Sequence, residues 1–280
     1  MSGFIQLTDT HIVAEGQLAY GRSETAGPLR QAIATLNDQL PAITEVECVI
    51  VTGDLTDHGS EQEYKRFRCI MDVLALPYLV LPGNHDHRER LRATFADCAW
   101  MPRHGPIQWR RDFSGFCVIG LDTLVEGEHY GMIDADGLAF LDNNLAELGK
   151  TPVIVATHHP WLHSGIQAMD DNNLRNGQQL MERLEAYPGP ARMISGHVHR
   201  ALTTQIGNVL CQVSPSTCHA VHLDQRADSA NSLVMEPGAM TLYQFRKSQQ
   251  TIVSNQMAIS QFEGPWPFEQ EDARVIATPA

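Results

Sequence analysis

The chain has 280 residues, 43% of them apolar, and its 20 basic against 33 acidic side chains give a formal net charge of −13. Nucleic acid binding depends on many basic contacts to phosphates, so this charge argues against a general DNA or RNA binder and weakly against anionic membrane surfaces. No apolar run reaches the roughly 20 residues that span a bilayer, and the N-terminus "MSGFIQLTDTH" lacks the segments of a signal peptide.

The first third of the chain alternates apolar runs with helical patterns. Short β-branched or aromatic runs predict strands, and leucines spaced by three or four residues predict an amphipathic helix. Ser60 and Glu63 form a capping box, which predicts a helix start. The expected elements are a strand at 4–7, a helix at 29–40, a strand at 46–51, a helix from 60 to about Leu74 and a strand at 78–81.

The pattern then changes. The sequences "IQWRRDF" and "FCVIGL" predict a hairpin around 114–115. They are followed by a helix at 138–148, a strand at 152–156, a helix at 178–186, a strand at 191–194 and further strands without helices in "RALTTQI", "VLCQV", "MTLYQF" and "QTIVSN". Alternating strands and helices indicate a largely parallel sheet, and the added strands favour a two-sheet α/β sandwich. We expect one domain over residues 1–258, followed by a C-terminal tail at 259–280.

Five of the predicted strands end in polar side chains of similar kind. In open α/β sheets ligands bind beyond the carboxyl ends of the strands, so five such ends indicate one site. The motifs are Asp9-x-His11, Gly53-Asp54, Gly83-Asn84-His85-Asp86, His158-His159 and Gly196-His197-x-His199. The glycines before Asp54, Asn84 and His197 are expected to ease sharp turns near the site.

The chemistry of these side chains indicates metal. Carboxylate, amide and imidazole groups without cysteine suit Fe, Mn, Zn, Co or Ni. There are too many of them for one tetrahedral ion, whereas two ions about 3.5–4 Å apart would use them all and share a carboxylate.

The ordered pattern D-x-H, GD, GNHD, H, GHxH resembles the calcineurin-like metallophosphoesterase superfamily. "GDLTDHGSEQEY", "LPGNHD", "THHPWL" and "SGHVHR" are similar to the class III cyclic-nucleotide phosphodiesterases and to bacterial glycerophosphodiesterases, and "MDDNNLRNGQQL" and "GPW" at 264–266 resemble the latter. The resemblance implies the metallo-dependent phosphatase fold, a four-layer α/β/β/α sandwich of two mixed sheets flanked by helices. It also implies two divalent ions, Fe or Mn first, with Zn or Co as alternatives.

The resemblance also implies a role for each motif residue. Asp9, His11 and His199 would hold the first metal, Asn84, His158 and His197 the second, and Asp54 would bridge them. The expected catalytic residues are Asp54, Asn84 and His85, and the expected substrate contacts are Asn84, His85 and His199. His85 would face the substrate phosphate or the leaving oxygen rather than a metal. Asp86 is expected to orient a histidine ring, or else to fix its loop.

We therefore expect a metal-dependent hydrolase of small phosphodiesters, with 3′,5′-cyclic nucleotides as the first substrate class and attack by a metal-activated hydroxide. Glycerophosphodiesters are the alternative. A nuclease fits the charge poorly, and a catalytically silent scaffold fits poorly with a complete ligand set. The expected partner is a small phosphodiester, with neither a nucleic acid polymer nor a membrane.

Three further expectations concern the rest of the chain. Residues 100–120 are a candidate dimerisation hairpin of a homodimer or higher homo-oligomer, although Arg110 and Arg111 are equally typical of a charged sheet edge. Six cysteines in no C-x-x-C pair favour free thiols in a cytoplasmic protein, with an inter-subunit disulfide as the alternative. His159 is expected to pack behind the site. The remaining histidines are expected at a solvated rim (58, 87, 163) or away from the motifs (104, 129, 219, 222), although the resemblance suggests a loop near the pocket for 219 and 222.

Overall fold

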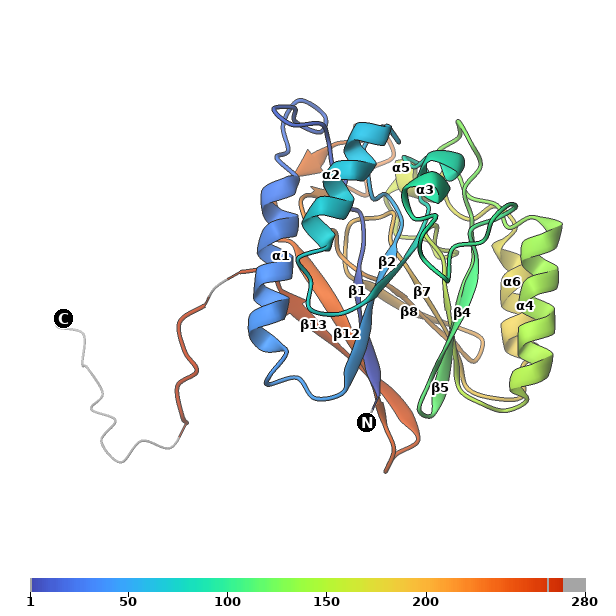
Figure 1. Ribbon diagram of the computed structural model, residues 1–280. Helices are drawn as coiled ribbons and strands as arrows, with labels where there is room; N and C mark the ends of the chain where they lie inside the picture. The colour runs from blue at the N-terminus through green and yellow to red at the C-terminus, as the bar shows by residue number, and fades with distance from the viewer. Residues whose placement is uncertain (1, 261, 269–280) are drawn as a thin grey trace, which may run out of the picture.

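A computed structural model describes residues 2–260 and 262–268 of the chain, so part of the predicted tail lies outside the described residues. Two mixed sheets pack face to face, and helices cover both outer faces (Figure 1). This arrangement confirms the predicted four-layer α/β/β/α sandwich.

The first sheet has the strand order β13-β12-β1-β2-β3. Strands β1, β2 and β3 are parallel to one another, β12 runs antiparallel to β1, and β13 runs antiparallel to β12. The strands are β1 (Gly3–Leu7), β2 (Val46–Thr52), β3 (Tyr78–Leu81), β12 (Ala239–Arg246) and β13 (Thr251–Ala258).

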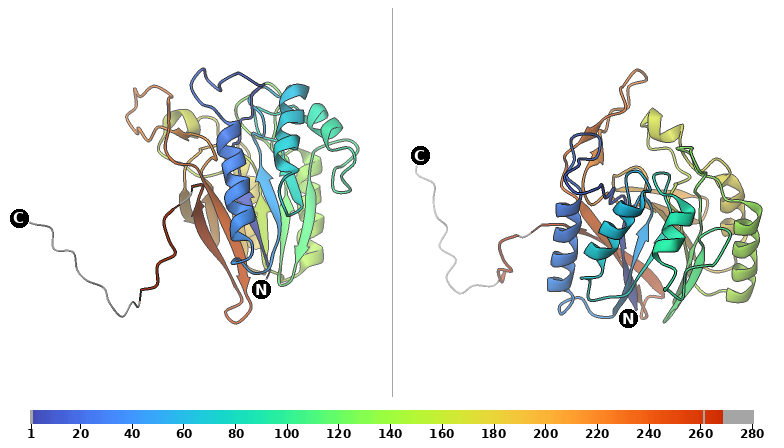
Figure 2. Two further views of the ribbon diagram at one scale, coloured as in Figure 1. Left: turned by 60° about the vertical axis from the view of Figure 1, so that its left-hand side comes forward. Right: turned by 45° about the horizontal axis from the view of Figure 1, so that its top comes forward.

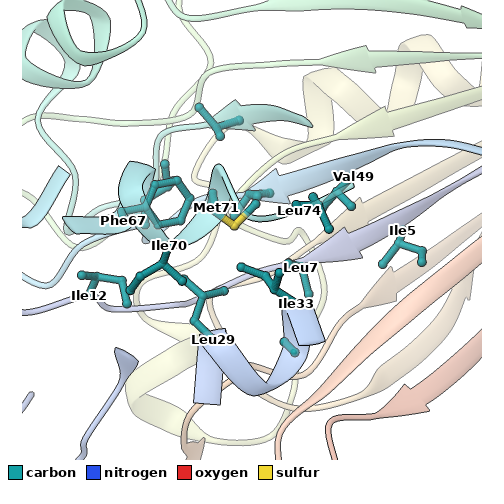
Figure 3. Close-up of a cluster of buried hydrophobic side chains, with 14 of the residues drawn as sticks. Ile5, Leu7, Ile12, Leu29, Ile33, Val49, Phe67, Ile70, Met71 and Leu74 are labelled. Atoms are coloured by element: carbon teal, nitrogen blue, oxygen red, sulfur yellow. The ribbon is translucent and has the colours of Figure 1, made fainter. Parts of the chain in front are cut away.

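Three helices cover the outer face of the first sheet: α1 (Ala26–Gln39), α2 (Glu61–Met71) and α3 (Arg88–Thr94). Leu29 and Ile33 of α1 and Phe67 of α2 pack with Leu7 of β1 and Val49 of β2 in one buried cluster (Figure 3). Each fully buried aliphatic or aromatic side chain of this kind contributes about 1.5–3 kcal/mol relative to an exposed one.

The predicted capping box is present at the start of α2. The Ser60 hydroxyl accepts from the Glu63 N–H at 3.3 Å, and the Glu63 carboxylate accepts from the Ser60 N–H at 3.0 Å. The predicted end at Leu74 is wrong by three residues, because α2 stops at Met71 and Leu74 continues as a turn. A buried Leu74 side chain extends the apolar spacing beyond the helix itself.

The second sheet has the strand order β4-β5-β6-β7-β9-β8. Strands β5, β6, β7 and β9 are parallel, and the two edge strands run antiparallel to their neighbours. Helices α4 and α6 cover its outer face. The elements are β4 (Trp109–Phe113), β5 (Phe116–Gly120), α4 (Ala135–Leu148), β6 (Val153–Ala156), α6 (Gly177–Ala186), β7 (Ala191–Ser195), β8 (Leu202–Ile206) and β9 (Val209–Val213).

Aromatic side chains fill the space between the two sheets. Phe113 and Phe116 stack with ring centroids 4.6 Å apart, and Phe4 stacks on Tyr243 at 4.9 Å. These rings hold the sheets at a fixed distance, so that the ends of β1, β2 and β3 face the ends of β6 and β7.

The predicted hairpin forms, as β4 and β5, and β4 is an edge strand of the second sheet. Arg110 forms ion pairs with Asp112 and with Glu147 of α4, and Arg111 lies 3.5 Å from Glu47 of the first sheet. Both arginines thus have acidic partners in their own chain. Pairing of two copies through this hairpin stays a prediction.

The remaining elements are short: α5 (Gln167–Asp170), β10 (Ala220–Val221) and β11 (Leu233–Val234). None of the helices within the described ranges is long and apolar enough to cross a membrane. All six cysteines are free thiols within this chain, and Cys69 is exposed.

Candidate metal centre

The structure brings all seven predicted metal ligands together where strands of the two sheets end. They come from the segments that follow five strands. Asp9 and His11 follow β1, Asp54 follows β2, Asn84 follows β3, His158 follows β6, and His197 and His199 follow β7. Six of these seven residues are buried, and Asn84 is half-buried. A polar cluster in such a position needs a compensating charge or a bound ion.

The first group of ligand atoms surrounds His11 Nε2. This atom lies 3.1 Å from His199 Nε2 and 3.5 Å from Asp54 Oδ2. His199 Nε2 lies in turn 3.5 Å from Asp9 Oδ1. Asp9, His11, Asp54 and His199 therefore form one four-residue cluster with the spacing of a metal site.

The second group surrounds the amide oxygen of Asn84. Asn84 Oδ1 lies 2.9 Å from His197 Nδ1 and 3.1 Å from His158 Nε2. His158 Nε2 lies 3.3 Å from Asp54 Oδ2, the same oxygen that faces His11. The two groups thus meet at one carboxylate.

The outer nitrogens of three histidines are held by oxygen acceptors. His11 Nδ1 contacts Asp57 Oδ1 at 3.0 Å, His158 Nδ1 the carbonyl of Thr52 at 2.8 Å, and His199 Nδ1 the carbonyl of His219 at 3.1 Å. The rings of His11 and His199 then carry their proton on Nδ1 and direct the lone pair of Nε2 into the site. His158 would do so once a metal ion replaced the second proton that Asp54 and Asp9 favour. Metal-binding histidines are oriented in this way.

The spacing of the inward atoms fits a bound cation. Ligands about 2.1 Å from one ion and 90° apart lie about 3.0 Å from each other. The His11 and His199 Nε2 atoms have this separation, and two imidazole lone pairs facing each other at 3.1 Å repel unless a cation lies between them. In the second group, His197 Nδ1 and Asn84 Oδ1 have a similar separation of 2.9 Å.

Burial sets the charge of the rings. It lowers the pKa of His11 and His197 well below the usual range and that of His199 to about 4, so these imidazoles are neutral and able to bind metal. Burial also acts to lower the pKa of His158, but the carboxylates of Asp54 and Asp9 outweigh it and raise the value to about 9. Burial acts to raise the pKa of Asp54, and His158 and His85 outweigh it and hold it well below 3.8.

Five of the predicted ligands have left-handed backbone conformations. Their φ angles are 52° at Asp9, 42° at His11, 49° at Asp54, 71° at His197 and 56° at His199. Residues other than glycine rarely adopt this region, and strain of this kind is concentrated at functional sites. At these positions the chain leaves the extended conformation of the strand and turns at the site.

Two glycines fit closely against the ligands, for different reasons. Gly53 has a φ of +100°, as expected for a sharp turn. Gly83 has no positive φ, and a Cβ there would lie 2.2 Å from Asp54 Oδ1. The prediction that the glycine before Asn84 eases a turn is therefore wrong, because its role is to let the chain approach Asp54 closely.

His85 lies beside the ligand groups and faces the cavity. Its backbone N–H donates to Asp54 Oδ1 at 2.8 Å, and its ring Nδ1 contacts the carbonyl of Asp57 at 2.9 Å. Nε2 is left toward the cavity, 3.3 Å from the hydroxyl of Tyr20.

Asp86 does not orient a histidine ring; it fixes the loop, the alternative left open by the sequence. Its carboxylate accepts from the N–H groups of Leu55, Thr56 and Gly83 and from the hydroxyl of Tyr64. Asp57 has the orienting role instead, through its contact to His11 Nδ1.

A cavity of about 540 Å³ opens in front of the site, lined by Asn84, His85, His197 and His199 among others. Tyr20, His129 and His219 also line it, and sequence reasoning missed Tyr20 and placed His129 away from the motifs. The segment between β1 and α1 lies beside the β10–β11 segment at the same end of the molecule (Figure 2). Tyr20 of this segment packs against His219, which precedes β10, with ring centroids 5.6 Å apart. No local pattern predicts that approach.

His159 lies behind the ligands. Its Nδ1 is 2.8 Å from the Thr123 hydroxyl, and its Nε2 is 3.2 Å from the carbonyl of His129. Both nitrogens therefore have partners, and the ring packs against His158 and His197 with centroids 4.8 and 4.7 Å away.

Sequence relatives cover most of the chain. A protein of Arcobacter nitrofigilis named "Probable glycerophosphodiester phosphodiesterase GpdQ" is 33% identical over 273 residues, which are 97% of this chain and 98% of that protein. The "3′,5′-cyclic adenosine monophosphate phosphodiesterase CpdA" of Pseudomonas aeruginosa is 31% identical over 215 residues, 76% of this chain and 75% of that one.

A solved structure has the same fold. The dimetal phosphatase from Danio rerio superposes with a TM-score of 0.60 at 13% identity, covering 92% of this chain and 99% of that chain. Residues 3–201 match the family described as calcineurin-like phosphoesterase. This match spans all five motifs and confirms the resemblance, so the chain belongs to the calcineurin-like phosphoesterase family.

Proposed function

We propose that the chain hydrolyses small phosphodiesters with the help of two divalent ions. The observation that carries the proposal is the shared position of Asp54 Oδ2, 3.5 Å from His11 Nε2 in one ligand group and 3.3 Å from His158 Nε2 in the other. A carboxylate between two sets of nitrogen and oxygen donors suits a pair of ions.

The proposed ligands are Asp9, His11 and His199 for one ion, Asn84, His158 and His197 for the other, and Asp54 for both. When bound, such ions neutralise charge on phosphoryl oxygens and lower the pKa of a bound water. The donors suit Fe and Mn, with Zn and Co as alternatives. Metal analysis of protein purified without added metal decides among them.

His85 is proposed to act on the substrate. Its Nδ1 is engaged with the carbonyl of Asp57, so Nε2 remains for the phosphate or the leaving oxygen. Burial acts to lower the pKa of His85, but the Asp54 carboxylate and the Asp57 carbonyl outweigh it and raise the value, which favours the protonated ring that a proton donor needs. Asn84 and His199 line the same cavity and are proposed to contact the substrate.

We propose 3′,5′-cyclic nucleotides as the first substrate class. Relatives named as cyclic nucleotide phosphodiesterases support it, at 31% and 32% identity over three quarters or more of the chain. Glycerophosphodiesters are the second candidate, favoured by the relative that matches 97% of the chain.

Purified protein loaded with Mn²⁺ is expected to hydrolyse bis(p-nitrophenyl) phosphate, and EDTA is expected to abolish the reaction. A kinetic panel of cyclic AMP, cyclic GMP and glycerophosphoethanolamine then ranks the two substrate classes. Absence of turnover with Mn, Fe, Zn and Co in separate preparations would refute the enzymatic proposal.

A further inference from the structure

Besides the candidate ligands, the cavity is lined by residues from two further parts of the chain. One part is α5 and the turn after it, and the other is β10, β11 and the residues just before β11; we call them the first and the second wall of the outer part of the cavity. The side chains that form them are Met169 and Asn172 on the first wall and Val221, Asn231, Ser232 and Leu233 on the second.

The outer walls combine apolar and neutral polar groups. Met169, Val221 and Leu233 offer apolar contact, and the amides and the hydroxyl between them donate and accept hydrogen bonds without net charge. Pockets of this composition bind uncharged groups and orient them through a few polar contacts.

No lysine or arginine is found among the described residues that line the cavity. Arg200 and Arg226, on or next to the elements of the second wall, are both paired with acidic side chains. Arg200 donates to the Val221 carbonyl at 2.7 Å and pairs with Glu236 at 3.0 Å, and Arg226 Nε pairs with Asp224 at 2.8 Å. Near the first wall, the guanidinium of Arg175 lies 3.3 Å from the centre of the Tyr130 ring.

We propose, on the basis of the proposed function, that the outer part of the cavity receives an uncharged alcohol substituent. The site then selects phosphodiesters whose phosphodiester group is their sole negative charge. A second phosphate or carboxylate in this part would lose water without gaining a cationic partner, and that loss is costly. Phosphomonoesters with an anionic side group and polyanionic diesters are therefore poor ligands.

A matched pair of substrates tests the proposal. Propyl p-nitrophenyl phosphate and 2-carboxyethyl p-nitrophenyl phosphate share the leaving group and nearly the same length, and differ by one carboxylate. We expect kcat/KM to be roughly tenfold or more higher for the propyl ester, as one unscreened charge in a partly buried cavity implies. Calorimetric titration with propyl phosphate and 2-carboxyethyl phosphate gives the same comparison without turnover.

Adding a cation to the second wall is expected to reduce the preference for the propyl ester over the 2-carboxyethyl ester. Asn231 is exposed, and its side chain has no hydrogen bond within the described part of the chain, so Asn231→Lys is well tolerated. The ratio of the two kcat/KM values should fall by roughly tenfold, and high salt should restore it. Val73→Lys is the control, because Val73 is 69% exposed and lies outside the cavity lining.

The outcomes separate the two proposals. Hydrolysis of both esters at equal kcat/KM, or an equal response of the two lysine variants, would overturn the neutral-substituent proposal and leave the phosphodiesterase proposal standing. If neither ester is hydrolysed, the result counts against the phosphodiesterase proposal. The affinities for propyl phosphate and 2-carboxyethyl phosphate would then decide whether the outer cavity disfavours the carboxylate.

Discussion

Asp54 is the side chain on which both halves of the candidate site depend. Because its Oδ2 faces His11 Nε2 and His158 Nε2 at 3.5 and 3.3 Å, we expect Asp54→Ala to lose both ions. Metal content measured by mass spectrometry after dialysis checks this. Asn84→Ala is the matched control. Asn84 Oδ1 contacts His158 and His197 of the second group, so this variant should lose mainly the second ion. Wild-type content of two ions in Asp54→Ala would rule out the shared position.

Substitution of His85 is expected to lower kcat and to leave the metal content unchanged. His85→Ala should lower kcat by about 10²–10⁴, the usual contribution of a positioned acid or base. The loss should be larger for substrates with alkoxide leaving groups than for p-nitrophenyl esters, because a poor leaving group needs the proton. Steady-state kinetics with both kinds of ester, on metal-quantified protein, measures the difference.

Tyr20→Phe is the companion variant for His85. The Tyr20 hydroxyl lies 3.3 Å from His85 Nε2. Its removal should therefore lower kcat less than His85→Ala does, again more for alkoxide than for p-nitrophenyl leaving groups. An unchanged rate with alkoxide leaving groups in His85→Ala would remove His85 from the mechanism, whatever Tyr20→Phe shows.

The loops after β2 and β3 are held together by one buried carboxylate. Asp86 accepts from three N–H groups, those of Leu55, Thr56 and Gly83, at 2.9–3.3 Å. In Asp86→Ala these three buried donors lose their acceptor, and at about 1–3 kcal/mol for each unsatisfied group we expect a loss of about 3–9 kcal/mol in the free energy of unfolding. Urea denaturation measures it.

Asp86→Asn is the control for this element. It keeps one carbonyl oxygen as an acceptor in the same position, so its cost should be clearly smaller. Equal stability of Asp86→Ala and the wild type would show that the two loops are held by their backbone alone.

The elements themselves could be predicted because their signals are local. Apolar runs identified the strands, and Ser60 with Glu63 identified the start of α2. The motifs could be assigned to one site because each follows a predicted strand and because their order resembles that of a known family. Tyr20 could not be assigned to it, because its position depends on a long-range approach of the segment after β1 to β10. The sequence did not identify Asp57 as the partner of His11 Nδ1, and it left two roles open for Asp86, because the contacts of both carboxylates depend on how the loops fold.

At the scale of the whole molecule, the candidate site joins the two sheets. Asp9, His11, Asp54 and Asn84 follow strands of the first sheet, and the three other histidines follow strands of the second. Aromatic packing between Phe4, Phe113 and Phe116 holds the sheets along their length. Bound ions would link the two sheets at one end. There, buried polar groups of the two sheets repel each other when no ion lies between them.

Metal binding is therefore expected to stabilise the whole fold. A ligand that binds the folded state alone adds about 2.7 kcal/mol at a free concentration of about 100 times its Kd. We expect Mn²⁺ to raise the free energy of unfolding by at least this amount for two ions, and EDTA to reverse the gain. Hydrogen exchange should slow in the segments after β1–β3 and after β6 and β7 together, because the ions bind both sheets. Asp54→Ala should show neither effect. Protection confined to one sheet would contradict a connection between the two.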